Sequence, residues 1–514
     1  MDAAATGLPC RRADRVPAVR RFCGRAGKGA AGLIDALGFP TGRAVALDDR
    51  VRVWNDASAV LGGAPWGVSR IAPAGRDFVR RLADSGARGV VPSPGVEAAL
   101  TDLLLKRGIV HPVAATRVMV VDVVVPAYER PDLLRDCLES LRAASPGARV
   151  IVVDDASTDP GVAAAARSAG AALVLHAVNR GPAAARNTGL REAASPIVAF
   201  VDSDCTVTGG WLDTLVAHFD DPRVAAVAPR IVPRSPSSGL LARFQTTRSA
   251  LDMGPRPELV TFGAPLGFLP SAALLVRRSA VGDSAFDEDL RLGEDVDLIW
   301  RLSEAGRLVR YEPAAVVTHE IRPTSGWARR IFDYGTSAAP LDRRHPGRLA
   351  PARFSGWNLA IAVILLARKP SAGVRASTAL GIAGTATALL ARRLRGSGVD
   401  AGVAPVVIGR TLASDAQAAG HLLRREWWPL GWIALGSGVR SRAGAAATAA
   451  MLIPLVLQWR SRRPDVDLPR YLGLRLIEDA AYGAGVIVGA VRARQAGVLL
   501  PLVRLPYLPG RNRR

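Results

Sequence analysis

PIVAFVDSDCT, residues 196–206, is the most informative stretch of this chain. Its apolar run leads directly into Asp202-Ser203-Asp204, and such a run between turn-forming residues predicts a buried strand. Ligands of open α/β sheets bind outside the carboxyl ends of the strands. Residues i and i+2 of an extended chain share a face, so both carboxylates can turn towards one cation. Taken alone, the stretch is more typical of a solvated Asp-Ser-Asp turn, so the neighbouring segments have to decide between the two interpretations.

Strands and helices alternate around this stretch. Apolar, β-branched runs predict strands at 118–125, 150–153 and 172–175, and residues 183–194 predict the helix before the strand at 197–201. This alternation predicts an α/β class with a doubly wound, mostly parallel sheet. The continuous apolar character of the strands predicts burial on both faces of the sheet.

Polar clusters follow the predicted strands. They are Pro126-Ala127-Tyr128-Glu129, Asp154-Asp155, Asn179-Arg180-Gly181 with Arg186-Asn187, and Asp202-Ser203-Asp204. Glu294-Asp295 later opens a further predicted helix. Taken singly, Asp154-Asp155 is typical of a helix N-cap, and Glu294-Asp295 of charge compensation at a helix start. Only the occurrence of all these clusters together favours a functional site.

Residues 118–320 resemble the inverting nucleotide-sugar glycosyltransferases of family 2. The motifs that carry the resemblance are VVVPAYER, VVDDAST, NRGPAAARNTGL, FVDSDC and GEDVDLIWRL, in the order of that family. The resemblance implies a GT-A fold and a transferase that uses a divalent metal, Mg²⁺ or Mn²⁺. Single displacement would convert an α-linked nucleotide sugar into a β-linked product.

The resemblance also implies roles for individual residues. Pro126, Ala127 and Glu129 would line the nucleotide pocket, Asp155 or Asp154 would accept the uracil N–H, and Arg186 and Asn187 would lie near the phosphates and the sugar. Asp202 and Asp204 would hold the ribose and the metal, and Asp295 would be the general base, its pKa raised by Glu294. Some relatives place a metal or phosphate ligand at the position of His319, although a lone histidine is often structural. Gly263, Gly267, Trp300 and Trp327 are candidates for sugar-binding platforms.

Composition narrows the class of protein. The formal net charge is +22, and the only lysines are Lys28, Lys106 and Lys369, so arginine carries almost all of the positive charge. The sequence has no stripe of basic residues interleaved with aromatic residues, so the positive charge does not predict nucleic-acid binding. Attraction to an anionic membrane surface or a passive compositional bias explains the charge. The spacing of Cys10, Cys23, Cys137 and Cys205 predicts neither a metal site nor a disulfide framework, which favours a reducing compartment.

Two further regions precede the catalytic domain, predicted at 115–340. Residues 1–43 are rich in arginine, lack the apolar core of a signal peptide and are expected to be disordered, so secretion is not predicted. Residues 44–114 predict short strands and two helices, a small winged-helix-like domain. It resembles the peptide-recognition domains of peptide-modifying systems. A plain structural cap on the catalytic domain is the alternative.

Residues 341–514 contain apolar runs bracketed by arginines and tryptophans. No run reaches the roughly 18 uninterrupted apolar residues of a spanning helix. We expect helices that lie on the cytoplasmic face of the cell membrane, with one or two inserted segments at most. A soluble, alanine-rich bundle is the alternative.

The chain combines a small peptide-recognition-like domain, a family 2 catalytic domain and an apolar, basic C-terminal region. In this combination it resembles the glycosyltransferases of the mycofactocin system. That resemblance implies transfer of β-linked glucose from UDP-glucose to a peptide-derived redox cofactor precursor. One alternative is a membrane-associated transferase that elongates a cell-wall glycan or glycolipid, of the rhamnosyl or galactofuranosyl type. Another is a non-catalytic protein that binds a nucleotide sugar.

Overall fold

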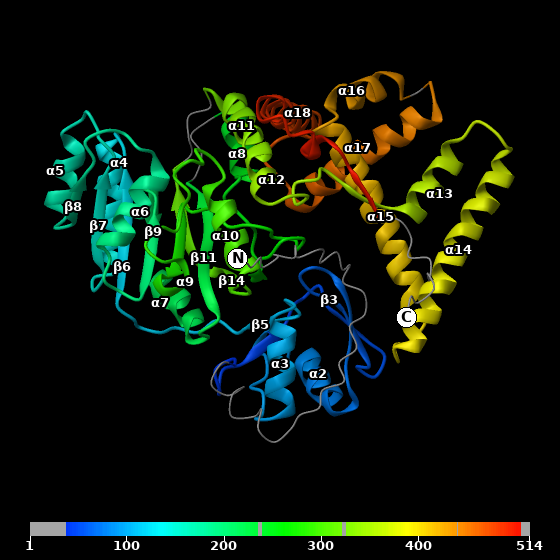
Figure 1. The fold of residues 1–514 in the computed structure, drawn as a ribbon, viewed down its shortest axis with the longest axis horizontal. Helices are drawn as coiled ribbons and strands as arrows, with labels where there is room; N and C mark the ends of the chain where they lie inside the picture. Colours follow the sequence, from blue (N-terminus) through cyan, green and yellow to red (C-terminus); the bar gives the residue numbers. More distant parts are fainter. Residues whose placement is uncertain (1–37, 235–238, 321–324, 439, 505–514) are drawn as a thin grey trace, which may run out of the picture.

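A computed structural model describes residues 38–234, 239–320, 325–438 and 440–504. Figure 1 shows three parts: a small N-terminal unit, an α/β domain and a region of long helices. Cys10 and Cys23 and most of the predicted arginine-rich segment lie outside the described residues. Cys137 and Cys205 are free and buried.

The α/β domain is built on a nine-stranded sheet with the order β10-β14-β11-β13-β9-β6-β7-β8, and β12 pairs with β14. Neighbours β8, β7, β6 and β9 are parallel, as are β11 and β14, whereas β13, β10 and β12 pair in the antiparallel sense. The strands are β6 (Val121–Ala127), β7 (Arg149–Asp154), β8 (Ala172–Leu175), β9 (Ile197–Val201), β10 (Cys205–Val207), β11 (Val224–Pro233), β12 (Glu258–Leu259), β13 (Ala273–Arg277) and β14 (Leu308–His319). The predicted α/β class with a mostly parallel sheet is confirmed.

Helices cover both faces of this sheet. Alternate residues of β6 contribute to two separate apolar cores, Val123 to one and Val124 to the other. The helices and 3₁₀ turn of the domain are α4 (Pro131–Ala144), α5 (Gly161–Ser168), α6 (Pro182–Glu192), α7 (Trp211–Val216), η2 (Ala217–Asp220), α8 (Leu240–Thr247), α9 (Arg278–Val281) and α10 (Glu294–Glu304). Val118 and Val120 are 85% and 72% exposed, so β6 begins later than the apolar run at 118 suggests.

The N-terminal unit has a core of its own. Two helices pack on a three-stranded antiparallel sheet, β2-β3-β4, and on the antiparallel pair β1-β5. The elements are β1 (Val45–Leu47), β2 (Arg52–Trp54), β3 (Ala59–Gly62), β4 (Gly67–Arg70), α2 (Pro73–Ser85), η1 (Gly86–Arg88), α3 (Val96–Leu105) and β5 (Val110–Pro112). Strands β2 and β5 and both helices lie where the sequence suggests them, whereas β1, β3 and β4 are additional, and a peptide-binding role stays a prediction.

The N-terminal unit touches both other parts of the molecule. Arg50 forms ion pairs with Glu258 of the α/β domain, at 2.7 Å. On the other side, the Trp54 indole N–H donates to Asp400, and the apolar side chains of β3 pack against the ends of two long C-terminal helices. The unit therefore connects the α/β domain with the helical region.

The C-terminal region is helical. Two of its helices, α11 and α18, lie side by side (Figure 1), and a Cβ added to Gly485 would stand 1.9 Å from the Phe332 carbonyl oxygen. Such close approach of two helix backbones requires glycine. The elements are α11 (Trp327–Thr336), α12 (Ala338–Arg344), β15 (Arg353–Ser355), α13 (Gly356–Leu366), α14 (Ala372–Gly396), α15 (Val403–Arg424), α16 (Trp428–Ser437), α17 (Arg442–Arg462), α18 (Leu468–Ala493), η3 (Ala496–Leu499) and β16 (Leu502–Arg504).

Among the described residues, α14 is the one helix that is long and apolar enough to cross a membrane, with 25 residues. Glycine, serine and threonine residues interrupt the apolar residues of α14 without adding charge. A criterion of uninterrupted apolar residues therefore does not predict this helix as a membrane span. Only 17% of its most apolar window is buried within the protein.

Candidate active site

Side chains from several elements meet at the carboxyl edge of the sheet. Parallel strands β6, β7 and β9 end here, Asp202 follows β9, and α10 begins here with Glu294 and Asp295. The Asp202 backbone N–H donates to the Ala272 carbonyl at 2.9 Å, which fixes the acidic turn beside the chain that enters β13. The topology therefore brings together the carboxylates of 202–204 and 294–295.

Arg186 of α6 joins the two acidic groups. Its Nη2 donates to Asp202 Oδ1 at 2.6 Å, and its Nη1 donates to Glu294 Oε1 at 3.1 Å. The guanidinium is buried, and although burial opposes its charge, the neighbouring carboxylates raise its pKa above the ordinary value. Arg186 thus holds two carboxylates together that would otherwise repel each other.

Asp295 has the properties of a general base. Burial, followed by the negative charge of Glu294, raises its pKa from 3.8 to about 7, although its carboxylate accepts the backbone N–H groups of Val296 and Ser271. Burial raises the pKa of Glu294 as well. A carboxylate with a pKa near the working pH is well suited to take a proton from a hydroxyl.

Asp204 and His319 face each other across the β10-β14 ladder. His319 Nε2 lies 3.3 Å from Asp204 Oδ1, and Cys205 and His319 are paired residues of the antiparallel strands. The Glu320 backbone N–H donates to the Asp204 carbonyl at 2.9 Å, which closes the strand ends on each other. The structure thus places these two predicted ligands in contact.

The donor set fits a hard divalent cation bound in part by its substrate. Asp204 and His319 offer a carboxylate and an imidazole, while Asp202 is held by Arg186. Within the described parts of the chain, no group of three or more His, Cys, Asp or Glu side chains forms a metal site. Mg²⁺ commonly takes one or two protein carboxylates and completes its shell with phosphate oxygens and water, so the single carboxylate of Asp204, with His319 beside it, is sufficient.

The β7 carboxylates organise the adjoining loops. Asp155 accepts backbone N–H groups from Arg180 at 2.9 Å and Gly181 at 2.7 Å, and His176 Nδ1 lies 2.7 Å from the same carboxylate. Asp154 accepts the Ser157 N–H at 2.9 Å. Both carboxylates are buried, so they shape this loop pair, and contact with a nucleobase stays a prediction.

Glu129 and Asn187 are also engaged by the protein. Glu129 has a positive φ of 55°, and its carboxylate accepts the Thr158 N–H and hydroxyl at 2.8 and 2.9 Å. The Asn187 amide is fully buried, exchanges hydrogen bonds with the Phe286 backbone and donates to Glu288 at 3.1 Å. Pro126 and Ala127 lie at the end of β6, beside Asp154. Asn187 therefore fastens the loop at 284–288, and its contact with the donor stays a prediction.

The two tryptophans expected as sugar platforms are packed side chains instead. Trp300 is 6% exposed and donates its indole N–H to the Gly267 carbonyl at 2.8 Å. Trp327 is 9% exposed and packs edge-on against Phe244. That expectation is wrong for both, because each ring contributes to the attachment of the C-terminal region.

Two site residues were missed by sequence reasoning. His176 bridges Asp155 and Thr188, with its Nε2 at 3.0 Å from the threonine hydroxyl, and Ser271 donates its backbone N–H to Asp295. A single histidine after a predicted strand and a main-chain donor leave no pattern in a sequence. Neither could have been found without the tertiary contacts.

Comparison with known proteins agrees with this geometry. The model of Glycosyl transferase family 2 matches residues 122–283. The chain is 39% identical over 482 residues to the Pre-mycofactocin glycosyltransferase of Mycobacterium tuberculosis, which covers 91% of this chain and 99% of that protein. It is 31% identical over 228 residues to the succinoglycan biosynthesis protein ExoO of Rhizobium meliloti, covering 42% of this chain and 64% of that protein.

Among solved structures, a mannosyltransferase from Pyrobaculum calidifontis in complex with GDP-Man and Mn²⁺ is similar to this chain. Its TM-score is 0.40 at 18% identity, and the match covers 74% of this chain and 89% of that chain.

The GT-A-like fold and the family match define an enzyme of the glycosyltransferase class. The prediction that the protein is an enzyme is therefore confirmed. The comparisons do not support the alternative of a non-catalytic binding protein. The chain belongs to glycosyl transferase family 2, in the group of the pre-mycofactocin glycosyltransferases.

Proposed function

We propose that this enzyme transfers glucose from UDP-glucose to a hydroxyl group of the peptide-derived mycofactocin precursor, with inversion. The observation that carries the proposal is the 39% identity that extends over 91% of the chain. This match includes the N-terminal unit and most of the helical region, whereas the ExoO match covers only 42% of the chain. Parts outside the catalytic domain are the natural place for acceptor selection.

The catalytic steps are assigned to residues at the carboxyl edge of the sheet. Asp295 would take the proton of the acceptor hydroxyl, and Asp204 with His319 would hold a divalent ion against the diphosphate of the donor. A divalent ion held by these two residues would supply positive charge for the departing diphosphate. Arg186 keeps Asp202 and Glu294 in place and contributes positive charge on the same side.

The acceptor is proposed to be recognised by the N-terminal unit. It is clamped between Glu258 of the catalytic domain and Asp400 of the helical region, so its position relative to the base is set by two contacts. Disrupting it should impair use of the acceptor more than hydrolysis of the donor. Equal losses in both activities would make the unit a structural cap.

The deciding experiment supplies the purified enzyme with a panel of nucleotide sugars and with extract from cells that lack it. We expect a product heavier by one or more hexose units with UDP-glucose, in extract that contains the precursor. Transfer only from another nucleotide sugar would correct the donor. A product in lipid or polysaccharide fractions alone would contradict the acceptor.

A second candidate acceptor is a glycan or glycolipid at the membrane. Exposed apolar side chains on α13, α14 and α16 favour it: Val363 is 61%, Leu380 72% and Ile433 66% exposed. We infer from the same surface that the enzyme associates with the cytoplasmic face of the membrane. Sedimentation with anionic vesicles tests the association, and a protein that stays wholly in the supernatant would contradict it.

A further inference from the structure

The start of α10 is held from the C-terminal side of the catalytic domain. Gly293, the residue before α10, has a φ of +86°, and a Cβ added there would lie 2.8 Å from Leu341 of α12. Helix α12 in turn packs against α18 through Ala338, Ala339 and Val486. The helical region therefore reaches the turn that carries the predicted base.

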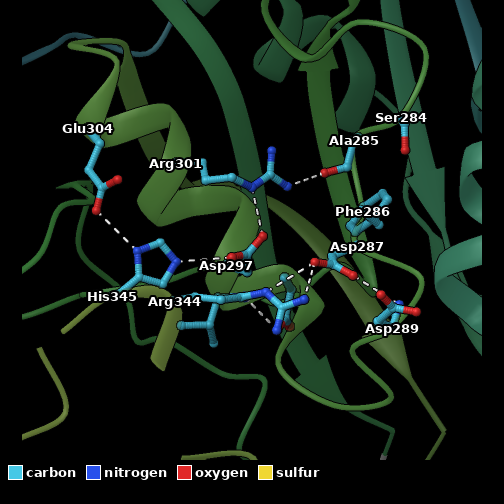
Figure 2. A network of polar contacts seen from close by, with 12 residues as sticks. Ser284, Ala285, Phe286, Asp287, Asp289, Asp297, Arg301, Glu304, Arg344 and His345 are labelled. Carbon is cyan, nitrogen blue, oxygen red and sulfur yellow. Dashed lines mark hydrogen bonds and ion pairs between the residues drawn. The ribbon is translucent and has the colours of Figure 1, made fainter. Parts of the chain in front are cut away.

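Asp297 is the polar centre of this contact (Figure 2). It lies two residues after Asp295, its side chain is 4% exposed, and each of its oxygens has a cationic or polar partner. His345 Nε2 lies 3.0 Å from Oδ1, and Arg301 Nε donates to Oδ2 at 2.7 Å. Arg301 also donates to the Ala285 carbonyl at 2.5 Å, which ties the loop at 284–289 to α10.

His345 bridges two carboxylates of the same helix. Its Nδ1 lies 3.1 Å from Glu304 Oε1, and its Nε2 faces Asp297. Carboxylate oxygens accept hydrogen bonds, and each ring nitrogen faces one carboxylate, so the imidazole connects the first and the last turn of α10. The ring is also packed edge-on against Trp300, with centroids 5.1 Å apart.

The charged groups around His345 come from two segments. Asp297, Arg301 and Glu304 belong to α10, and Arg348, from the chain after α12, lies 2.8 Å from Glu304. Arg344, next to His345, pairs with Asp287 and fixes the same loop from the other side (Figure 2). The His345 side chain, directly after α12, thus contacts both the first and the last turn of α10.

We propose that His345 and Asp297 form a positioning pair that holds the first turn of α10, and with it Asp295, in the geometry for proton abstraction. His345 acts through Asp297 and touches no reacting group. The pair lies outside the region matched by the family model, residues 122–283, and depends on the helical region for its support. This inference rests on the proposed role of Asp295 as the base.

The chain offers a matched control. His218 Nε2 lies 3.0 Å from Glu312 Oε2, and both side chains are as buried as those of the His345–Asp297 pair. Glu312 precedes His319 by seven residues on β14, which places the control pair roughly 20 Å from the site along the strand. His345→Gln and His218→Gln therefore each disturb a buried imidazole–carboxylate contact, and the two contacts lie at different distances from the base.

The test compares both variants in steady-state transfer. We expect His345→Gln to lower kcat about 10- to 100-fold with a change in donor KM below about threefold, because a misplaced catalytic group loses rate and not affinity. His218→Gln should lower the melting temperature but keep kcat within about twofold. Loss of rate in Asp297→Asn should not deepen when His345→Gln is added, because the two residues act as one unit. A wild-type kcat in His345→Gln, or equal losses in both histidine variants, would overturn the proposal.

A second measurement does not depend on sugar identity or on turnover. Hydrogen exchange of the backbone amides of α10 should accelerate in His345→Gln and stay unchanged in His218→Gln. Unchanged exchange in the first variant would refute the pair, whichever sugar the enzyme transfers. If the wild-type enzyme transfers a different sugar, the proposed donor fails and the kcat comparison still applies.

Discussion

The catalytic domain and the C-terminal helical region distribute their side chains in opposite ways. In the catalytic domain, β9 is buried along its whole length, and charged groups gather at the strand ends. In the helical region, Leu380 and Ile433 are 72% and 66% exposed, while Arg424 and Asp479 form a buried ion pair at 2.9 Å. The first arrangement is that of a domain surrounded by water, and the second is that of helices with an apolar outer surface.

This difference assigns different sources of stability and function to the two regions. Apolar burial stabilises the sheet. Its edge therefore does not have to contribute to stability and can hold carboxylates with a shifted pKa, such as Asp295. The helical region uses buried charges to join its own helices, and through α12 it supports α10. The predictions that follow test each side of this contrast.

The largest effect is expected at the sheet edge, from Asp295→Asn. Loss of the general base should lower transfer roughly 10²- to 10⁴-fold and leave donor binding near normal. In the wild-type enzyme the deprotonated form is active, so the rate should rise with pH through about 7, where the raised pKa of Asp295 lies. Initial rates against pH and calorimetric donor titration measure both effects. Lost binding with residual turnover would contradict the base role.

In the helical region, Arg424→Met should destabilise the fold. Removing Arg424 takes the shorter of two ion-pair partners from buried Asp479, and because Arg475 remains 3.4 Å away the cost should be about 2–3 kcal/mol, below the roughly 3–5 kcal/mol of a fully unpaired buried charge. The matched control is Arg243→Met, which breaks the exposed Arg243–Asp465 pair at 3.3 Å and should cost at most about 1 kcal/mol. Urea denaturation followed by circular dichroism measures both. Equal losses of unfolding free energy in the two variants would show that the buried pair stabilises the helical region no more than an exposed pair does.

The carboxylate edge is expected to depend on a divalent ion. Asp204→Asn should weaken metal-dependent donor binding by about 10- to 100-fold, because it removes the carboxylate that is proposed to bind the ion. A chelator should have the same effect on the wild-type enzyme without changing its helical content. Donor titrations with and without chelator provide the measurement, and full activity in chelator would exclude the metal from the reaction.

The smallest effect on stability is expected on the exposed apolar surface. Leu380→Gln should change the free energy of unfolding by about 0.5 kcal/mol or less, yet lower the fraction bound to anionic vesicles. Val178→Gln is the control, since Val178 is 65% exposed on the catalytic domain. Vesicle sedimentation of both variants separates a membrane surface from incidental exposure. Equal binding by both would argue against the membrane.

Local patterns predicted the elements well. The apolar run at 197–201 is β9, and the helices predicted in the N-terminal unit are α2 and α3. These elements follow from side-chain periodicity, which is a local property. The exposed Val118 and the buried Trp300 were misread, because exposure depends on what lies opposite and not on residue type.

The residues of the candidate site also fall into those that local patterns predict and those that only tertiary contacts reveal. The carboxylates at 202–204 and 294–295 could be named from motifs, since each follows a recognisable strand or opens a helix. The bridge that Arg186 makes to Glu294 spans 108 positions in the chain, and the contact of His345 with Asp297 spans 48. Contacts over such separations exist only once the sheet and the helical region are assembled.

The amino-acid sequence alone therefore determined the α/β class, the strand ends that carry acids and the family resemblance, because these rest on short-range patterns of apolar and charged residues. Tertiary structure alone decided which carboxylates share a guanidinium, which tryptophans are buried and that α12 supports the turn of Asp295. The physical reason is that burial, hydrogen bonding and pKa depend on neighbours in space, and distant segments supply those neighbours.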